Sequence, residues 1–215
     1  PKWFFVGFMR SLGVFKRRCV LTLPGRENRM EWALSSRNNE EVTERYDVWA
    51  EEYDADVQSY GYRSPAIVAG IVGRYFPWDS SPILDAGAGT GIMGEVLNTL
   101  GYEGITALDL SQGMLEVAAR KGVYADLRQM ALGKDLDFPT DHFAVVVCMG
   151  AFASGHAPPN SFDELVRITR PGGHIIFTVS SDMYERGGFK EKQQELQQTS
   201  AWQLVEVVGP YVSLP

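Results

Sequence analysis

An acidic residue and three glycines at alternate positions follow a short apolar run near the middle of the chain. The segment reads Asp85-Ala86-Gly87-Ala88-Gly89-Thr90-Gly91 and precedes a helical pattern over residues 92–100. Glycine has no Cβ, so the backbone can turn sharply and a ligand can lie directly against the main chain. The helix that follows presents free N–H groups and the positive end of its dipole. This order of strand, tight turn and helix predicts a nucleotide-type binding site.

The glycine spacing and two carboxylates narrow the chemistry of the ligand. A dinucleotide fingerprint reads G-x-G-x-x-G and seats a pyrophosphate at the helix N-terminus, whereas the spacing here is G-x-G-x-G. Asp85 stands just before the turn, where its carboxylate would repel a diphosphate and attract a cationic amino-acid group. Asp109 ends the next predicted strand, where it can accept hydrogen bonds from ribose hydroxyls. The combination of the loop with both carboxylates is a much stronger signal than the glycines alone.

These motifs resemble those of the class I S-adenosylmethionine-dependent methyltransferases. The resemblance covers residues 40–208, and two short segments, 150–158 and 201–208, are similar to the methyltransferase-like branch named after the Williams–Beuren syndrome region. The matching motifs are Leu84–Gly91 after the first strand, Leu108–Ser111 with Met114-Leu115 after the second, Arg170–Gly173 before the fifth, and Tyr46–Asp54 as a helix that caps the cofactor.

The resemblance implies S-adenosyl-L-methionine as cofactor and assigns roles to several residues. The glycines would pack against its methionine part, and Asp109 would hold its ribose. Tyr46 and Tyr53 would close over the bound cofactor, while Trp49 is expected in the core. The complete set of predicted cofactor-binding residues is Tyr46, Tyr53, Asp85, Gly87, Ala88, Gly89, Gly91, Asp109, Leu110, Met114, Ala131, Leu132 and Met149.

Two positions leave questions open within this resemblance. Leu132 stands where the family usually has an acidic residue that meets the adenine, so the adenine contact differs here. His156 lies beyond the fourth strand, and it is either a solvated loop histidine, the interpretation we favour, or a general base for a nitrogen or oxygen nucleophile. No catalytic residue is assigned, because methyl transfer can rely on holding a nucleophile in line with a reactive sulfonium. No metal site is expected.

Composition and charge limit the class of protein and its partners. The 215 residues are 45% apolar and 22% charged, without a run of 18 apolar residues, so we expect one globular domain and no membrane span. Residues 1–39 carry eight Lys/Arg and two Asp/Glu, whereas the remainder carries twelve and twenty-five. An acidic domain is a poor match for nucleic acid. We therefore expect a small-molecule or protein acceptor, a monomer, and a cytoplasmic location, with a mitochondrial one as the alternative that the basic N-terminus raises.

Alternating strand and helix patterns predict an α/β fold with a doubly wound, mostly parallel sheet whose final antiparallel strand is missing or truncated. We expect residues 1–39 to be a basic extension, disordered or not native to the fold, and residues 40–215 to be a methyltransferase domain with capping helices over 40–76. The first predicted strand ends at Asp85. The other predicted strands span residues 104–109, 124–127, 143–149, 173–179 and 203–208.

Three functions compete. The first is an S-adenosylmethionine-dependent methyltransferase that acts by in-line transfer. The second is a protein that binds S-adenosylmethionine or S-adenosylhomocysteine with weak or no catalysis, an alternative raised by Leu132 and the short C-terminus. The third, a nicotinamide oxidoreductase, is disfavoured by the glycine spacing and by Asp85.

Overall fold

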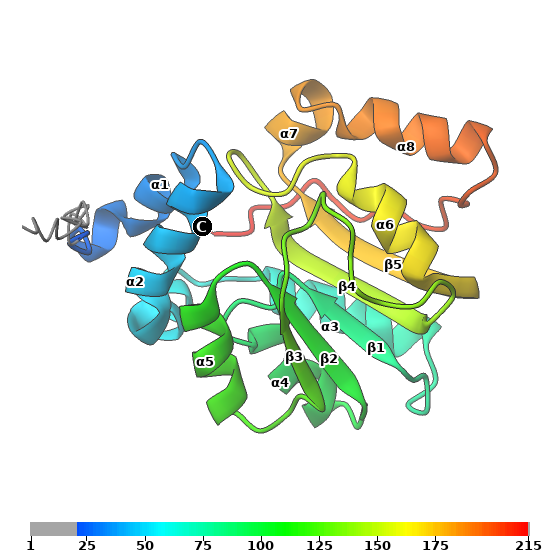
Figure 1. The fold of residues 1–215 in the computed structure, drawn as a ribbon, viewed down its shortest axis with the longest axis horizontal. Coiled ribbons are helices and arrows are strands. Elements are labelled where there is room, and N and C mark those ends of the chain that lie inside the picture. The colour runs from blue at the N-terminus through cyan, green and yellow to red at the C-terminus, as the bar shows by residue number, and fades with distance from the viewer. Residues whose placement is uncertain (1–20, 215) are drawn as a thin grey trace, which may run out of the picture.

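A parallel sheet forms the centre of the protein. The computed structural model describes residues 21–214, and within them five strands are arranged in the order β3-β2-β1-β4-β5 (Figure 1). Every neighbouring pair is parallel, which agrees with the predicted doubly wound architecture. The strands are β1 (Ile83–Ala86), β2 (Ile105–Asp109), β3 (Asp126–Gln129), β4 (Phe143–Phe152) and β5 (Thr169–Val179).

Helices cover both faces of the sheet, because successive strand residues point to opposite sides. In β4, Val145 and Val147 pack on the face covered by α3 and α4, whereas Val146 and Cys148 pack on the face covered by α6 and α8. Both faces are apolar, as expected for a central parallel strand. The helices are α3 (Ser64–Tyr75), α4 (Ile92–Thr99), α5 (Gln112–Arg120), α6 (Ser161–Ile168), α7 (Ser181–Arg186) and α8 (Phe189–Gln198).

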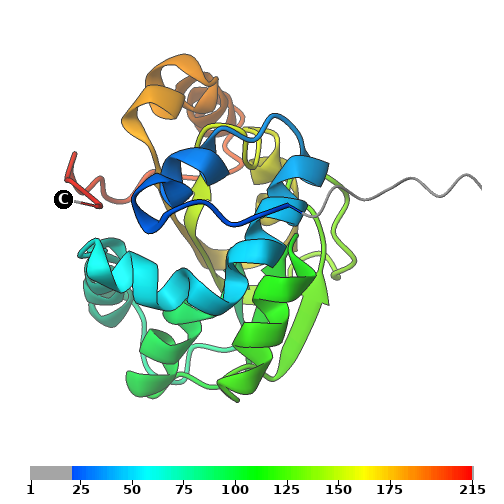
Figure 2. The same ribbon diagram turned by 90° about the vertical axis from the view of Figure 1, so that its left-hand side faces the viewer.

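Two further helices lie across the carboxyl ends of the strands. Helix α2 (Asn39–Ser59) begins where the Asn38 side chain accepts a hydrogen bond from the Glu41 N–H, which satisfies one free donor of its first turn. Helix α1 (Arg29–Leu34), with a short 3₁₀ turn over Arg26–Asn28, packs on α2 (Figure 2). These helices close one end of the sheet and thereby position the site described below.

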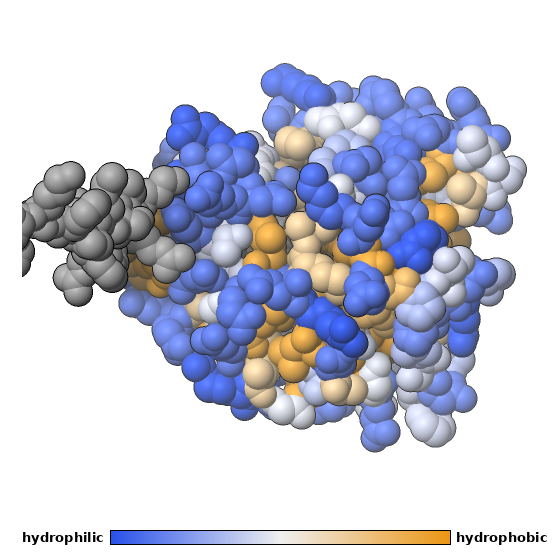
Figure 3. Space-filling view, viewed as in Figure 1, coloured by the Kyte–Doolittle hydropathy of each residue, from blue (hydrophilic) through white to orange (hydrophobic). Residues whose placement is uncertain are grey.

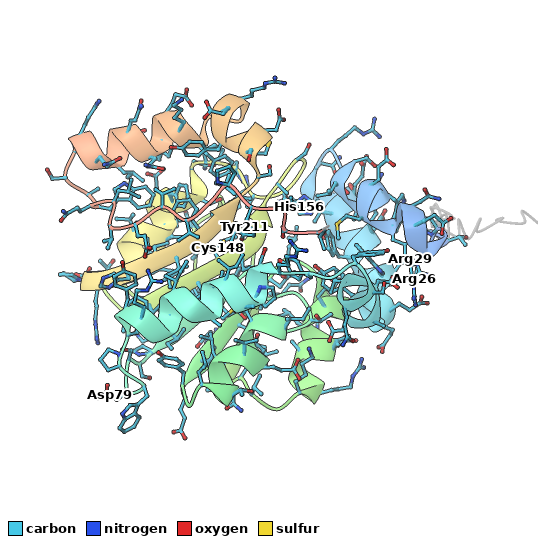
Figure 4. The ribbon with its side chains drawn as sticks, turned by 180° about the vertical axis from the view of Figure 1, so that it is seen from behind. Arg26, Arg29, Asp79, Cys148, His156 and Tyr211 are labelled. Atoms are coloured by element: carbon cyan, nitrogen blue, oxygen red, sulfur yellow. The ribbon has the colours of Figure 1, made fainter. Side chains whose placement is uncertain are left out.

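The basic N-terminal segment takes part in this packing. The buried Asp56 carboxylate of α2 pairs with Arg26 and Arg29 at 2.6 Å each and accepts a hydrogen bond from the Trp49 indole at 2.7 Å. Figure 4 shows both arginines on these helices, close to one another. The packing of residues 26–34 thus continues across the domain boundary expected at residue 39, while residues 1–20 of that extension lie outside the described residues.

The prediction of a sixth strand over residues 203–208 is wrong. Residues 201–212 form neither helix nor strand, and the chain instead runs irregularly back toward α3. Glu206 contacts Arg74 and Tyr75 there, and the Ser213 carbonyl accepts the Arg63 N–H at 2.9 Å. A strand forms only where its backbone N–H and C=O groups can bond to a neighbouring strand. An apolar composition alone does not provide that neighbour.

None of the helices in residues 21–214 combines the length and the hydropathy that a membrane span requires.

Candidate functional site

A cavity of about 760 Å³, partly open to solvent, lies between α2 and the carboxyl ends of β1, β2 and β4. This is the edge of an open parallel sheet where ligands bind. Figure 3 shows apolar surface across the middle of one face of the molecule, bordered by hydrophilic side chains. A smaller cavity of about 330 Å³ shares the glycine loop with the first and extends toward α4.

The glycine loop forms the floor of both cavities. Its amides are held in place by β2, because the Gly87 and Ala88 N–H groups both donate to the Leu108 carbonyl, at 2.7 and 3.0 Å. Gly89 has a φ of +55°, and a Cβ placed on it would meet no protein atom within 4 Å. The left-handed backbone and the open space above it both favour glycine. The loop therefore leaves its main chain accessible to a ligand.

The Asp109 carboxylate joins the ends of two neighbouring strands. One oxygen accepts the Gly89 N–H and the other the Ser111 N–H, each at 2.8 Å. Burial of the side chain raises the pKa of Asp109 above its ordinary value, against the lowering effect of these backbone donors. Each carboxylate oxygen keeps a lone pair for a further donor. Asp109 can thus receive two ligand hydroxyls while remaining fixed by the protein.

Asp85 lies on the other side of the loop, on the wall of the smaller cavity. It is buried, and its carboxylate accepts a hydrogen bond from the Tyr124 hydroxyl at 2.6 Å. Burial raises the pKa of Asp85 to about 7, more than the Tyr124 hydrogen bond lowers it. A cation in that cavity would favour the charged form of this carboxylate.

Carboxylates of helix α2 hold it over the cavity through bonds to both ends of α5. Asp47 accepts the Gly113 N–H at 2.9 Å and the Ser111 hydroxyl at 2.5 Å, which extends the capping of α5. One turn and two turns further along, Glu51 pairs with Arg120 at 2.7 Å and Asp54 pairs with Lys121 at 2.7 Å. These contacts hold the inner face of α2 against the cavity.

The inner face of α2 is aromatic. Tyr46 and Tyr53 line the cavity, and their ring centroids lie 6.2 Å apart. Trp49 lies between them in the helix and is fully buried, as the sequence predicted. Burial raises the pKa of both tyrosines, so both hydroxyls stay protonated at neutral pH.

His156 lies on the cavity wall opposite α2. Its Nδ1 is 2.7 Å from the Ser154 carbonyl, and its Nε2 is 2.9 Å from the Tyr46 hydroxyl. Partial burial lowers the pKa of His156 below its ordinary value, which favours the neutral ring. His156 belongs to the β4–α6 loop, and Figure 4 labels it on the side of the sheet where α1 and α2 lie. His156 is thus a loop residue, as one of the two interpretations expected, but it is only partly exposed and both of its ring nitrogens have partners within the protein.

The structure brings nearly all of the predicted site residues together. Asp85 and Ala88 line the smaller cavity, and Gly91 lines neither cavity but caps α4 with a φ of +88°. The predicted residues on the wall of the larger cavity are Tyr46, Tyr53, Gly87, Gly89, Asp109, Leu110, Met114, Ala131, Leu132 and Met149.

Comparison with known proteins identifies the family. The family described as "Methyltransferase domain" matches residues 84–177, which contain the glycine loop, Asp109, the fourth strand and most of the fifth. Human "Methyltransferase-like protein 27" is 33% identical over 164 residues, which are 74% of this chain and 66% of that protein. "Demethylmenaquinone methyltransferase" of Symbiobacterium thermophilum is 32% identical over 155 residues, 67% of this chain and 61% of that protein. The chain belongs to the class I S-adenosylmethionine-dependent methyltransferases. It spans less than two thirds of the length of these two relatives.

Solved structures agree on the fold of this member of the family. The [4+2]-cyclase SpnF has a TM-score of 0.58 at 18% identity and covers 74% of this chain and 73% of its own. A methyltransferase from Haloferax volcanii, solved in complex with the activator Trm112, has a TM-score of 0.55 at 21% identity and covers 71% and 74%. Because one of the two neighbours is named as a cyclase, the shared fold does not by itself specify the reaction.

The features of the cavity fit the cofactor of this methyltransferase family, S-adenosylmethionine. The glycine loop offers open main chain, and Asp109 offers two free acceptor positions. Met114, Met130 and Leu132 supply an apolar wall for a flat base. No carboxylate lines that wall among the described residues, which agrees with the departure noted at Leu132.

Sequence reasoning missed several residues on the cavity wall. Asn39 and Val42 lie on the first turns of α2, ahead of the expected tyrosines, and Tyr62 follows that helix. The helical spacing from Tyr46 back to Val42 and Asn39 is four and seven residues, and this could have placed all three on one face. No local signal indicates Ala157, because its position depends on how the loop after β4 packs.

Proposed function

We propose that this chain transfers the methyl group of S-adenosylmethionine to a small-molecule or protein acceptor by in-line displacement. The observation that carries the proposal is the joining of the Gly89 amide to the Asp109 carboxylate at the floor of a cavity that reaches Met149. When bound, the cofactor supplies a sulfonium-activated methyl group. The contribution of the chain is to bind and orient both reactants and to exclude water.

The binding roles follow from position. Gly87 and Gly89 would lie against the amino-acid part of the cofactor, and Asp109 would accept its ribose hydroxyls. Asp85, beside the amino-acid end of the loop, would favour a cationic group there. Tyr46 and Tyr53 on α2 would face the sulfonium, to which aromatic rings are attracted. The base would rest on Met114 and Leu132.

We also propose that the chain belongs to the methyltransferase-like branch of the Williams–Beuren syndrome region, on the strength of its identity with human "Methyltransferase-like protein 27". Its acidic balance beyond residue 39 favours a small molecule or a protein over a nucleic acid as acceptor. We infer a monomer in a reducing compartment such as the cytoplasm, in keeping with the buried free thiol of Cys148.

Calorimetric titration with S-adenosylmethionine, S-adenosylhomocysteine and NAD tests cofactor choice, and transfer of a tritiated methyl group to fractionated cell lysate tests catalysis. Binding of the first two ligands with labelling of an acceptor supports the proposal. Binding of NAD alone would contradict it. Binding of both adenosyl compounds without a labelled product at any protein concentration would favour a binding protein without catalysis.

A further inference from the structure

The contact between Tyr46 and His156 has a defined hydrogen-bond direction. The Nδ1 atom of His156 faces the Ser154 carbonyl, which only accepts, so Nδ1 carries the proton. The Nε2 atom of the neutral ring is then an acceptor, and the Tyr46 hydroxyl donates to it across 2.9 Å. Within residues 21–214 the Tyr46 hydroxyl has no other hydrogen-bond partner, so its lone pairs can accept a proton from a ligand. A proton delivered to that oxygen could therefore move on to Nε2.

The histidine is held firmly, although it lies in a loop. Gly155 has a φ of +75°, and a Cβ placed on it would overlap the Ser36 carbonyl between α1 and α2. On the other side, Pro158 packs so closely on Gly133 that a Cβ there would come within 2.6 Å. These close approaches fix the backbone of the loop, and the hydrogen bonds of the two ring nitrogens orient the imidazole on it. A base held in one geometry is what efficient proton transfer requires.

The charges around the pair exclude one class of acceptor. Of the described residues that line the cavity, none is Lys or Arg, so a carboxylate or phosphate acceptor would find no lysine or arginine side chain there to hold it. The titratable groups that share the cavity with His156 are the phenols of Tyr46 and Tyr53 from α2 and the Asp109 carboxylate from β2. The remainder of the wall is largely apolar. This environment suits a neutral or cationic group on an apolar body.

We propose that Tyr46 and His156 form a proton relay for a non-anionic methyl acceptor that carries a dissociable proton on nitrogen or oxygen. This inference rests on the proposed function and names the acceptor class. The acceptor's proton passes to the Tyr46 oxygen while the hydroxyl proton of Tyr46 passes to Nε2 of His156. The freed lone pair of the acceptor forms the new bond to the methyl carbon. The carbon–sulfur bond breaks with its electron pair on sulfur, and the positive charge ends on the imidazolium.

Removal of a proton limits methylation of phenols and alkylammonium groups, but it does not limit methylation of a carboxylate. Phenols and alkylammonium groups have ordinary pKa values near 10, so at pH 7 only about one molecule in 10³ has the free lone pair or the anion ready. A carboxylic acid with an ordinary pKa near 4 is already ionised. A relay therefore accelerates the first two groups and gives no advantage to the third.

The test uses the full chain with S-adenosylmethionine and three probes of matched size: 4-ethylphenol, 2-phenylethylamine and 3-phenylpropanoate. Methylated product is measured by mass spectrometry for the wild type, Tyr46→Phe, His156→Gln, the double variant and His142→Gln. His142 is exposed on the turn before β4 and serves as the matched control. S-adenosylhomocysteine affinity is measured for each protein by calorimetry, which tests the proposed function separately.

We expect methylation of the phenol, the amine or both, and the site of the methyl group distinguishes an oxygen from a nitrogen acceptor. Each single variant should lower kcat about 10²-fold, the double variant should lower it no further, and S-adenosylhomocysteine affinity of His156→Gln should stay within about threefold of the wild type. In the wild type kcat should fall at acid pH, below the ordinary histidine pKa, and His156→Gln should lack this fall.

Two sets of results would overturn the relay. Methylation of 3-phenylpropanoate at a rate comparable to the others, or of none of the probes while S-adenosylhomocysteine still binds, would contradict the acceptor class. Additive losses in the double variant, or an unchanged acid limb in His156→Gln, would contradict the coupling of the two residues. Absence of S-adenosylhomocysteine binding in the wild type would instead contradict the proposed function itself.

Discussion

Asp109 accepts the backbone N–H of Gly89 at 2.8 Å, and this bond ties the end of β2 to the glycine loop after β1. The same carboxylate accepts the Ser111 N–H at 2.8 Å. Both bonds use backbone donors, so the carboxylate is fixed by the fold on the wall of the cavity. The geometry of the loop and the binding capacity of Asp109 are therefore linked.

Replacing Asp109 with Ala should weaken S-adenosylhomocysteine binding by about 1–3 kcal/mol, because charge-assisted hydrogen bonds to the ribose are lost. Calorimetric titration measures the change. Asp79→Ala is the matched control, since Asp79 is exposed on a loop at the far end of the molecule (Figure 4). An Asp109→Ala protein that folds normally and binds as tightly as the control would place Asp109 in a purely structural role.

Replacing Gly89 with Ala, beside the same change at Gly122, should distinguish the effect of backbone strain on stability from the effect of an added methyl group on ligand binding. Gly89 and Gly122 have φ values of +55° and +67°, and an added Cβ meets no protein atom within 4 Å at either position. Both alanine variants should lose about 1 kcal/mol of unfolding free energy, as alanine disfavours this backbone region. Only Gly89→Ala should also weaken S-adenosylhomocysteine binding, because Gly89 lines the cavity and Gly122 does not. Equal affinities in the two variants would show that the ligand does not approach Gly89.

Asp85 should make stability depend on pH. Its pKa of about 7 in the fold lies above the unfolded value near 3.9. Between these values the folded state keeps a proton that the unfolded state has lost, so the unfolding free energy should fall as pH rises from 4 to 7 and then level off. Asp85→Asn keeps an acceptor for the Tyr124 hydroxyl and removes this titration.

Urea unfolding at pH 5, 6, 7 and 8 measures that effect. The difference between the wild type and Asp85→Asn isolates Asp85 from Asp109 and His156, which also have shifted pKa values. Between pH 5 and pH 8 the variant should gain about 3 kcal/mol of stability relative to the wild type. Parallel pH curves for the two proteins would mean that Asp85 is ionised throughout this range.

Asp56 should anchor the N-terminal segment to α2. Its removal leaves Arg29 without a carboxylate that it now contacts at 2.6 Å, and leaves the buried Trp49 indole without an acceptor. Asp56→Ala should cost about 3 kcal/mol of unfolding free energy, because a group left unpaired in the interior is costly. Asp56→Asn keeps an acceptor for Trp49 and should cost less. Urea unfolding measures both variants. A loss of unfolding free energy in Asp56→Ala no larger than that in Asp79→Ala would contradict the anchoring role of Asp56.

The parts of the site that the sequence predicted are those fixed by local chemistry. The glycine loop and the Ser111 cap of α5 depend on backbone conformations and bonds within a few residues, and both lie where expected. Asp109 follows from its place at the end of a strand. The parallel sheet follows from alternation of apolar strands with helices.

The parts that escaped prediction depend on partners far away in the chain. The Val-rich segment over residues 203–208 has strand composition, but no strand partner is present for it in residues 21–214. Helix α1 is held by Asp56, and His156 is held by the packing of Ser36 on Gly155. The basic residues of the N-terminal segment suggested an extension separate from the domain. The sequence did not show that two of them, Arg26 and Arg29, pair with Asp56 on α2.

A crystal structure of the chain grown with S-adenosylhomocysteine is the most direct test of the central claim. We expect the ligand over residues 87–91, its ribose hydroxyls within hydrogen-bond distance of Asp109 and its sulfur facing Tyr46 and Met149. Crystals that show the ligand bound elsewhere, or show none over the glycine loop at saturating concentration, would contradict the account.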